Sequence, residues 1–191
     1  MRFLFLFFLL SFSASLSINA QETTDLLLDI DEPWRSERLT FPIRFAPSLD
    51  YKGIEEVRFA EGWSSPDSDE FWTYTFLWYL DEDPKVTANI IEDDIEAYFN
   101  GLMNLVGKGS DIPDANVVFV KDANTTNTYI GKAKIFDAFF NKDIQELNIK
   151  AIVNYCSKTN KHTVLFTFSP KEFDHNIWKT LDTISLAVDC N

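Results

Sequence analysis

The sequence has few of the residues on which common catalytic and nucleotide-binding motifs depend. Among 191 residues there are 6 glycines and 2 histidines, His162 and His175. There is no Gly-x-Ser-x-Gly, Walker-type or His-Glu-x-x-His pattern, and so few glycines leave little room for a phosphate-binding loop. The sequence therefore indicates no cofactor and disfavours nucleotide-binding proteins and the motif-based hydrolases.

Positive charge is also scarce. The chain has 17 Lys and Arg against 30 Asp and Glu, a net charge of −13. Arg2 is the only charged residue among the first 20, so residues 21–191 carry a charge of −14. A phosphate backbone would be repelled by such a chain, and we expect no nucleic-acid partner.

One long apolar run is present, at the N-terminus. Met1 and Arg2 precede the uninterrupted apolar stretch 3–10, and a serine-rich segment follows up to Ala20. A charged start, a short apolar run and a small residue at the exit are typical of a secretory signal peptide, and the run is shorter than the roughly 20 residues that span a membrane. The sequence predicts a signal peptide at 1–20, a secreted or periplasmic protein, and no membrane span after cleavage.

The remainder is predicted to form an acidic lead-in over 21–33 and one α+β domain over 34–191. Alternating apolar residues predict strands, and Pro42 would make the first of them an edge strand. A spacing of three and four residues predicts a helix from the N-cap Thr87 to a stop at Gly107, and a final helix from Asp174 to about Val188. The predicted strands are 39–45, 55–60, 71–80, 116–121, 128–136, 147–156 and 162–168.

The predicted order is therefore βββ-α-ββββ-α. Short connections between strands favour antiparallel pairing. We expect an antiparallel sheet of about seven strands with both helices packed on one face.

The two cysteines are predicted to form a disulfide. Cys156 ends a predicted strand and Cys190 follows the final helix. A strand of about 8 residues and a returning helix of about 16 residues both cover roughly 25 Å, which brings the two cysteines together. In an oxidising compartment this favours the disulfide over a nucleophilic cysteine.

Two surface features are candidate binding sites. Lys132, Lys134 and Lys150 occupy strand positions opposite the buried register, so they would project from the sheet face that the helices leave open, with Arg44 and Arg58 as further candidates. Such a basic stripe would suit an anionic small molecule, a glycan or an acidic envelope protein. The alternative is that these lysines only keep the sheet soluble.

The tryptophans suggest a second binding feature. Trp72, Trp78 and Trp178 fall in core register, whereas Trp34 and Trp63 are free to be exposed. Trp63 begins a loop rich in hydroxyls and carboxylates, which would form an aromatic platform for a sugar; anchoring in the core is the alternative.

Acidic residues between Asp81 and Glu96 offer a different chemistry. If they met across the strand-to-helix turn, they could hold Ca²⁺ or act as a carboxylate pair for sugar hydrolysis. The spacing matches no EF-hand loop, and acids near a helix N-terminus are ordinary. We therefore keep a small carboxylate-dependent hydrolase as the alternative function.

The runs Arg58-Phe59-Ala60-Glu61-Gly62-Trp63 and 71–80 resemble small exported bacterial proteins of unassigned function. The predicted element order also resembles the PsbP/Mog1 type of α+β fold. Neither resemblance implies catalytic residues. The sequence thus favours an exported non-enzymatic binding or accessory protein.

Overall fold

The computed structural model describes residues 26–31, 33–108 and 111–190, so the predicted signal peptide lies outside the described residues. Its main element is a seven-stranded antiparallel sheet in the order β2-β3-β4-β8-β7-β6-β5, which confirms the α+β class. The strands are β2 (Arg35–Thr40), β3 (Gly53–Phe59), β4 (Tyr74–Leu80), β5 (Asn116–Lys121), β6 (Thr128–Phe136), β7 (Ile144–Cys156) and β8 (Lys161–Ser169).

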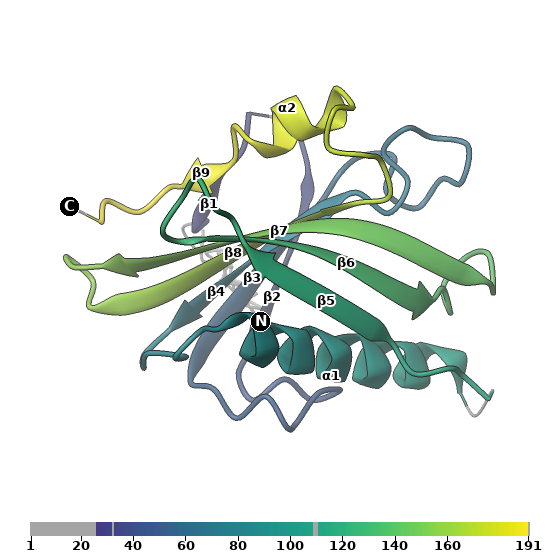
Figure 1. The fold of residues 1–191 in the computed structure, drawn as a ribbon, viewed down its shortest axis with the longest axis horizontal. Coiled ribbons are helices and arrows are strands. Elements are labelled where there is room, and N and C mark those ends of the chain that lie inside the picture. The colour runs from purple at the N-terminus through teal and green to yellow at the C-terminus, as the bar shows by residue number, and fades with distance from the viewer. Residues whose placement is uncertain (1–25, 32, 109–110, 191) are drawn as a thin grey trace, which may run out of the picture.

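The two helices lie on opposite faces of this sheet, so the prediction that both cover one face is wrong (Figure 1). Helix α1 (Ala88–Gly107) packs on one face against Phe76 and Trp78. Helix α2 (Ile177–Leu181) packs on the other face against Leu77. Because β4 carries large apolar side chains on both faces of the sheet, each face must be covered by another element of the fold.

Helix α1 begins where the sequence predicts. The Thr87 hydroxyl accepts a hydrogen bond from the amide of Ile90 (3.3 Å), as expected of an N-cap. Its end differs by one residue, because Lys108, and not Gly107, adopts the left-handed backbone conformation (φ 46°). Within the described residues no helix is both long enough and apolar enough to cross a membrane.

Helix α1 also covers the free edge of the sheet at β5. Amides of the β5 segment donate to the side chains of Glu92 (from Phe119, 2.6 Å), Glu96 (from Val117, 2.8 Å) and Asn100 (from Ala115, 2.7 Å). These acceptors are spaced four residues apart on one helical face and so meet alternate amides of the strand. They occupy the hydrogen-bonding groups through which an open edge strand would pair with another chain.

Several predicted elements differ in their bounds, and two of them differ substantially. The first predicted strand, 39–45, is instead β2 at 35–40, and the chain turns at Phe41–Pro42, so Pro42 lies outside the edge strand. The predicted C-terminal helix is reduced to α2, and residues 185–186 form the short strand β9 (Ser185–Leu186). The apolar residues assigned to that helix are nevertheless buried: Ile177, Trp178, Leu181 and Ile184.

The predicted lead-in over 21–33 is partly built into the fold. Strand β1 (Leu28–Asp29) pairs antiparallel with β9, and Leu27 and Leu28 are buried against the face that carries α2. Trp34, expected to be free for exposure, is only 6 % exposed in the same cluster. The apolar run at 26–28 therefore completes the second layer of the core.

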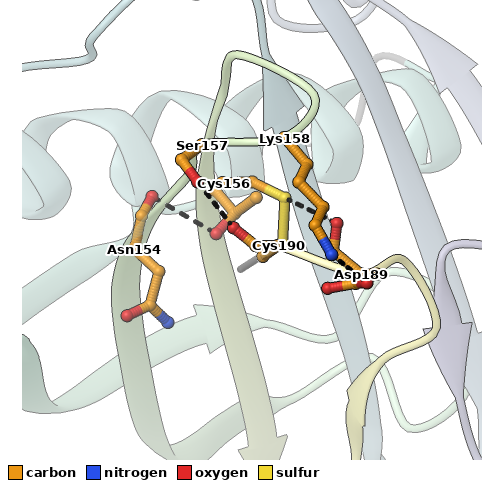
Figure 2. Close-up of a disulfide and its surroundings, with 7 residues drawn as sticks. Asn154, Cys156, Ser157, Lys158, Asp189 and Cys190 are labelled. Carbon is orange, nitrogen blue, oxygen red and sulfur yellow. Dashed lines mark hydrogen bonds and ion pairs between the residues drawn. A yellow bond between two sulfur atoms is a disulfide. The ribbon is translucent and has the colours of Figure 1, made fainter.

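Cys156 and Cys190 form the predicted disulfide (Figure 2). It joins the end of β7 to the segment after β9. Around it, the Ser157 amide donates to the carbonyl of Cys190 (3.1 Å), and Lys158 pairs with Asp189. The C-terminal segment is thus held both by β1 and by a covalent bond.

Reducing this disulfide is expected to destabilise the protein. The cysteines are 34 residues apart in sequence, and closing a loop of that length contributes about 3–4 kcal/mol in the chain-entropy treatment. Urea unfolding of the Cys156→Ser/Cys190→Ser variant should give a free energy of unfolding lower by that amount. An unchanged value would show that the β1–β9 pairing alone holds the C-terminal segment.

Candidate functional site

The predicted basic stripe lies on the face that α2 and its flanking segments cover. Each lysine is beside a carboxylate: Lys132 with Glu172 (3.5 Å), Lys134 with Glu146 (2.7 Å) and Lys150 with Asp182. Lys150 also lies over the ring of Trp178. Arg58 is buried beside Glu56, while Arg44 is exposed. A ligand would have to compete with these ion pairs, and a binding role for the three lysines stays a prediction.

Most of the acidic residues between Asp81 and Glu96 are held by separate partners. The pairs are Asp81 with Lys161, Glu82 with Lys52 (2.8 Å), Asp83 with Lys85 (2.8 Å) and Asp94 with the hydroxyl of Tyr51 (2.6 Å). Together with Glu92 and Glu96, which cap β5, they are tied to different parts of the fold. In the described part of the chain, no group of three or more His, Cys, Asp or Glu side chains is arranged to hold a metal ion.

The most distinctive feature is a cavity of about 270 Å³ between the sheet and α1. Its sheet wall consists of Leu39, Val57, Phe59 and Tyr74, from β2, β3 and the start of β4. The helix contributes Tyr98 and Leu102. This volume corresponds to about nine waters at roughly 30 Å³ each.

Loops complete the cavity with aromatic rings. Phe139 and Phe140 come from the β6–β7 connection. There the carboxylate of buried Asp137 accepts hydrogen bonds from the backbone amides of both residues (2.9 Å each). Trp63 comes from the loop between β3 and β4, and its ring meets that of Phe140 edge-on at 5.2 Å. Trp63, for which an exposed platform and anchoring in the core were the two alternatives, is half-buried in the cavity wall.

The helix lies very close to the 41–50 segment at Gly101. A Cβ atom at this position would overlap the backbone carbonyl of Phe45, which also lines the cavity. Glycine is unfavourable inside a helix by about 1 kcal/mol relative to alanine. Its presence here is explained by the backbone of the 41–50 segment lying directly against α1.

Two charged residues lie on the rim. Arg35 and Glu37, both from edge strand β2, are paired at 3.4 Å, and their side chains are 60 % and 52 % exposed. The guanidinium of Arg35 lies over the rings of Phe59 (4.8 Å) and Trp63 (5.7 Å). The cavity therefore has a polar, charge-balanced entrance and an aromatic interior.

A buried carboxyl group lies beside the cavity wall, between the sheet and α1. Glu55 is fully buried and accepts hydrogen bonds from the Tyr98 hydroxyl (2.9 Å) and from Trp78 Nε1 (2.7 Å). Burial raises the pKa of Glu55 to about 7, although the two hydrogen bonds act in the opposite direction. Tyr98 is thereby held in place as a cavity wall by a group that is itself not part of the lining.

Sequence reasoning identified most of these residues only as core. Alternation placed Trp72 and Tyr74 in a buried register, and nothing in that pattern distinguishes a wall from solid packing. The Phe139-Phe140 pair, in a turn between two strands, is one sequence signal, beside Trp63, that aromatic side chains gather outside the regular elements.

Comparison with known proteins found no matching family model, no similar curated protein and no similar solved structure. The resemblance to small exported bacterial proteins and to the PsbP/Mog1 type of fold therefore stays a prediction.

Proposed function

We propose that this protein is an exported, non-enzymatic binding protein that holds a small apolar molecule in the cavity between its sheet and α1. The observation that carries the proposal is the aromatic interior of that cavity beneath a charged rim. Ligand sites are concave and mostly apolar, with a few polar groups that orient the ligand. This cavity has that composition, and its volume suits a compact ligand.

The cavity is supported from several sides, which favours a preformed site. Gly101 fixes the distance between α1 and the 41–50 segment, Asp137 shapes the loop with the two phenylalanines, and Glu55 anchors Tyr98. A wall held by such contacts does not collapse readily, so the empty space is not removed by small adjustments. The ligand would enter without large rearrangement.

Export is supported by the predicted signal peptide together with the disulfide. Disulfides persist in oxidising compartments, and the Cys156–Cys190 bond is compatible with a secreted or periplasmic location. The alternative of a carboxylate-dependent hydrolase gains no support from the acidic segment, because Asp81, Glu82, Asp83 and Asp94 each bind a different partner.

Binding of a neutral fluorescent probe tests the proposal. N-phenyl-1-naphthylamine should bind residues 21–191 saturably, at one molecule per chain, with enhanced emission. Leu102→Trp, which fills the cavity, should reduce probe affinity at least tenfold, because Leu102 lines the cavity. The matched control is Leu105→Trp on the same helix, where the native side chain is 48 % exposed; it should bind as the wild type does.

Equal binding by the two leucine variants would place the probe on the outer surface and contradict the proposal. Absence of saturable binding to the wild type would contradict it as well. Thermal unfolding of both variants shows whether a loss of binding reflects the filled cavity or a disturbed fold.

A further inference from the structure

We infer that the ligand of the cavity is a free α-amino acid with a large aromatic side chain, whose carboxylate meets Arg35 and whose ammonium group meets Glu37. The inference rests on the proposed function, and it adds a charged but net-neutral head group to the apolar body of the ligand. It is carried by the juxtaposition of one positive and one negative side chain at the rim of an aromatic cavity.

The two charged groups of the rim are adjacent and accessible. Arg35 and Glu37 are paired at 3.4 Å, and their side chains are 60 % and 52 % exposed. In the described part of the chain neither side chain forms a hydrogen bond, whereas Arg38 and Arg58 both donate hydrogen bonds to Glu56 (2.8 and 3.0 Å). The N–H donors of Arg35 and the carboxylate oxygens of Glu37 are therefore open to a ligand.

A zwitterion suits this pair better than an ion of one sign. A carboxylate beside Arg35 and an ammonium group beside Glu37 give four charges of alternating sign, so the pair on the protein does not have to separate. An anion or a cation alone would be attracted by one member of the pair and repelled by the other. In a free amino acid both charged groups are attached to one carbon, so they are similarly close together.

The aromatic wall holds the arginine at the entrance. The guanidinium of Arg35 lies over the rings of Phe59 (4.8 Å) and Trp63 (5.7 Å). Cation–π contacts attract a guanidinium to the face of a ring, so this exposed side chain stays beside the cavity. Because the same two rings line the cavity, a ligand whose carboxylate meets Arg35 can place its side chain inside.

The volume and the rings of the interior favour an aromatic side chain. About 270 Å³ is just below the range of roughly 300–1,000 Å³ typical of sites for drug-sized ligands, which suits a molecule as small as one amino acid. Trp63 meets Phe140 and Phe139 edge-on, at 5.2 and 6.1 Å. Aromatic rings prefer such edge-to-face contacts, and a one- or two-ring side chain would extend this arrangement.

Three indoles with the same ring system test the inference at pH 7. L-tryptophan carries both charges, tryptamine carries the ammonium group alone, and indole-3-propionate carries the carboxylate alone. Calorimetry, and displacement of bound N-phenyl-1-naphthylamine, should show tryptophan binding the wild type about threefold to tenfold tighter than either analogue. The reason is that each analogue loses one exposed ion pair and keeps one repulsion.

Substitution of the two charged residues should shift the preference in opposite directions. In Arg35→Gln the rim keeps the negative charge of Glu37, so tryptamine should bind at least as tightly as tryptophan. In Glu37→Gln the rim keeps the positive charge of Arg35, so indole-3-propionate should bind at least as tightly as tryptophan. A purely structural role of the pair would weaken all three ligands alike. Arg44→Gln is the matched control, because Arg44 is exposed and does not line the cavity, and it should leave all three affinities unchanged.

Both substituted side chains are more than half exposed, so the variants should fold as the wild type does. Tryptophan that binds the wild type no more tightly than one of its analogues would overturn the inference, and so would a preference for tryptophan that persists in both variants. If the naphthylamine probe binds but no indole displaces it, the cavity remains a ligand site and the amino-acid inference alone fails. If neither the probe nor any indole binds, the proposed function fails with it.

Discussion

Replacing Glu55 with glutamine is expected to stabilise the protein at pH 8 and to leave its stability at pH 5 nearly unchanged. Burial raises the pKa of Glu55 from 4.5 to about 7. Between these values the unfolded chain has released the proton while the folded chain retains it, so stability falls as pH rises. The loss amounts to about 3 kcal/mol above pH 7. Glutamine resembles the protonated acid and carries no charge, so it avoids this loss.

Urea unfolding at pH 5 and pH 8, followed by tryptophan fluorescence, measures the effect. Burial also raises the pKa of Asp94, to about 6, beside Tyr51. Asp94 therefore contributes in the same direction. The free energy of unfolding of the double variant Glu55→Gln/Asp94→Asn should depend less on pH than that of either single variant. A wild type and Glu55→Gln that lose stability in parallel from pH 5 to pH 8 would show that Glu55 is ionised in the folded protein at both values.

The sheet could be predicted because its signal is local. Alternation such as that of Trp78, Leu80 and Phe76 marks a strand regardless of its neighbours, and the N-cap Thr87 is read from the residues beside it. The cysteine pairing was also right, although the segment before Cys190 is a short helix followed by extended chain. An extended segment rises more per residue than a helix. The shorter helix and the extended chain after it therefore still bring Cys190 to Cys156.

The second layer could not be predicted because it depends on distant parts of the chain. Leu27 and Leu28 read as an isolated apolar run near an acidic tail, and residues 185–186 read as the end of a helix. Their strand pairing exists only once α2 lies against the sheet. Tertiary contact overrides local preference in such short elements.

The cavity was beyond prediction for a related reason. Its walls come from β2, β3, β4, α1 and three loops, and a cavity depends on how all of these pack together. The left-handed conformation of Trp72 is equally invisible to alternation, which treats the residue as one more inward side chain.

Glu56, the neighbour of Glu55, points to the opposite face, where it joins the second layer to the sheet. Its carboxylate accepts hydrogen bonds from the backbone amides of Leu27 (2.8 Å) and Leu28 (3.2 Å). It also forms ion pairs with Arg38 (2.8 Å) and Arg58 (3.0 Å). Arg58 in turn donates to the carbonyl of Leu28 (2.8 Å). The first residues of the described chain are therefore fixed by one buried ionic network.

Glu56→Gln should lower the free energy of unfolding by about 3–5 kcal/mol, because it leaves the buried Arg58 without its counter-charge. Although burial acts to raise the pKa of Glu56, the hydrogen bonds and the two arginines lower it below its ordinary value. The stabilisation that the Glu56 carboxylate provides is therefore present above about pH 4.5, its ordinary pKa. It is lost as the pH falls through the lowered pKa of the folded protein. Glu55 acts in the opposite sense, so wild-type stability should be greatest near pH 4.5–5.

Unfolding of the two single variants across pH 3–8 separates these contributions. Glu55→Gln should remove the decline on the alkaline side, and Glu56→Gln should remove the decline on the acid side while lowering the whole curve. Proteolysis near residues 26–31 should be faster in Glu56→Gln alone, since only that variant loosens β1. Equal protection of this segment in both variants would show that pairing with β9 suffices to hold it, and that the ionic network contributes to the sheet but not to the second layer.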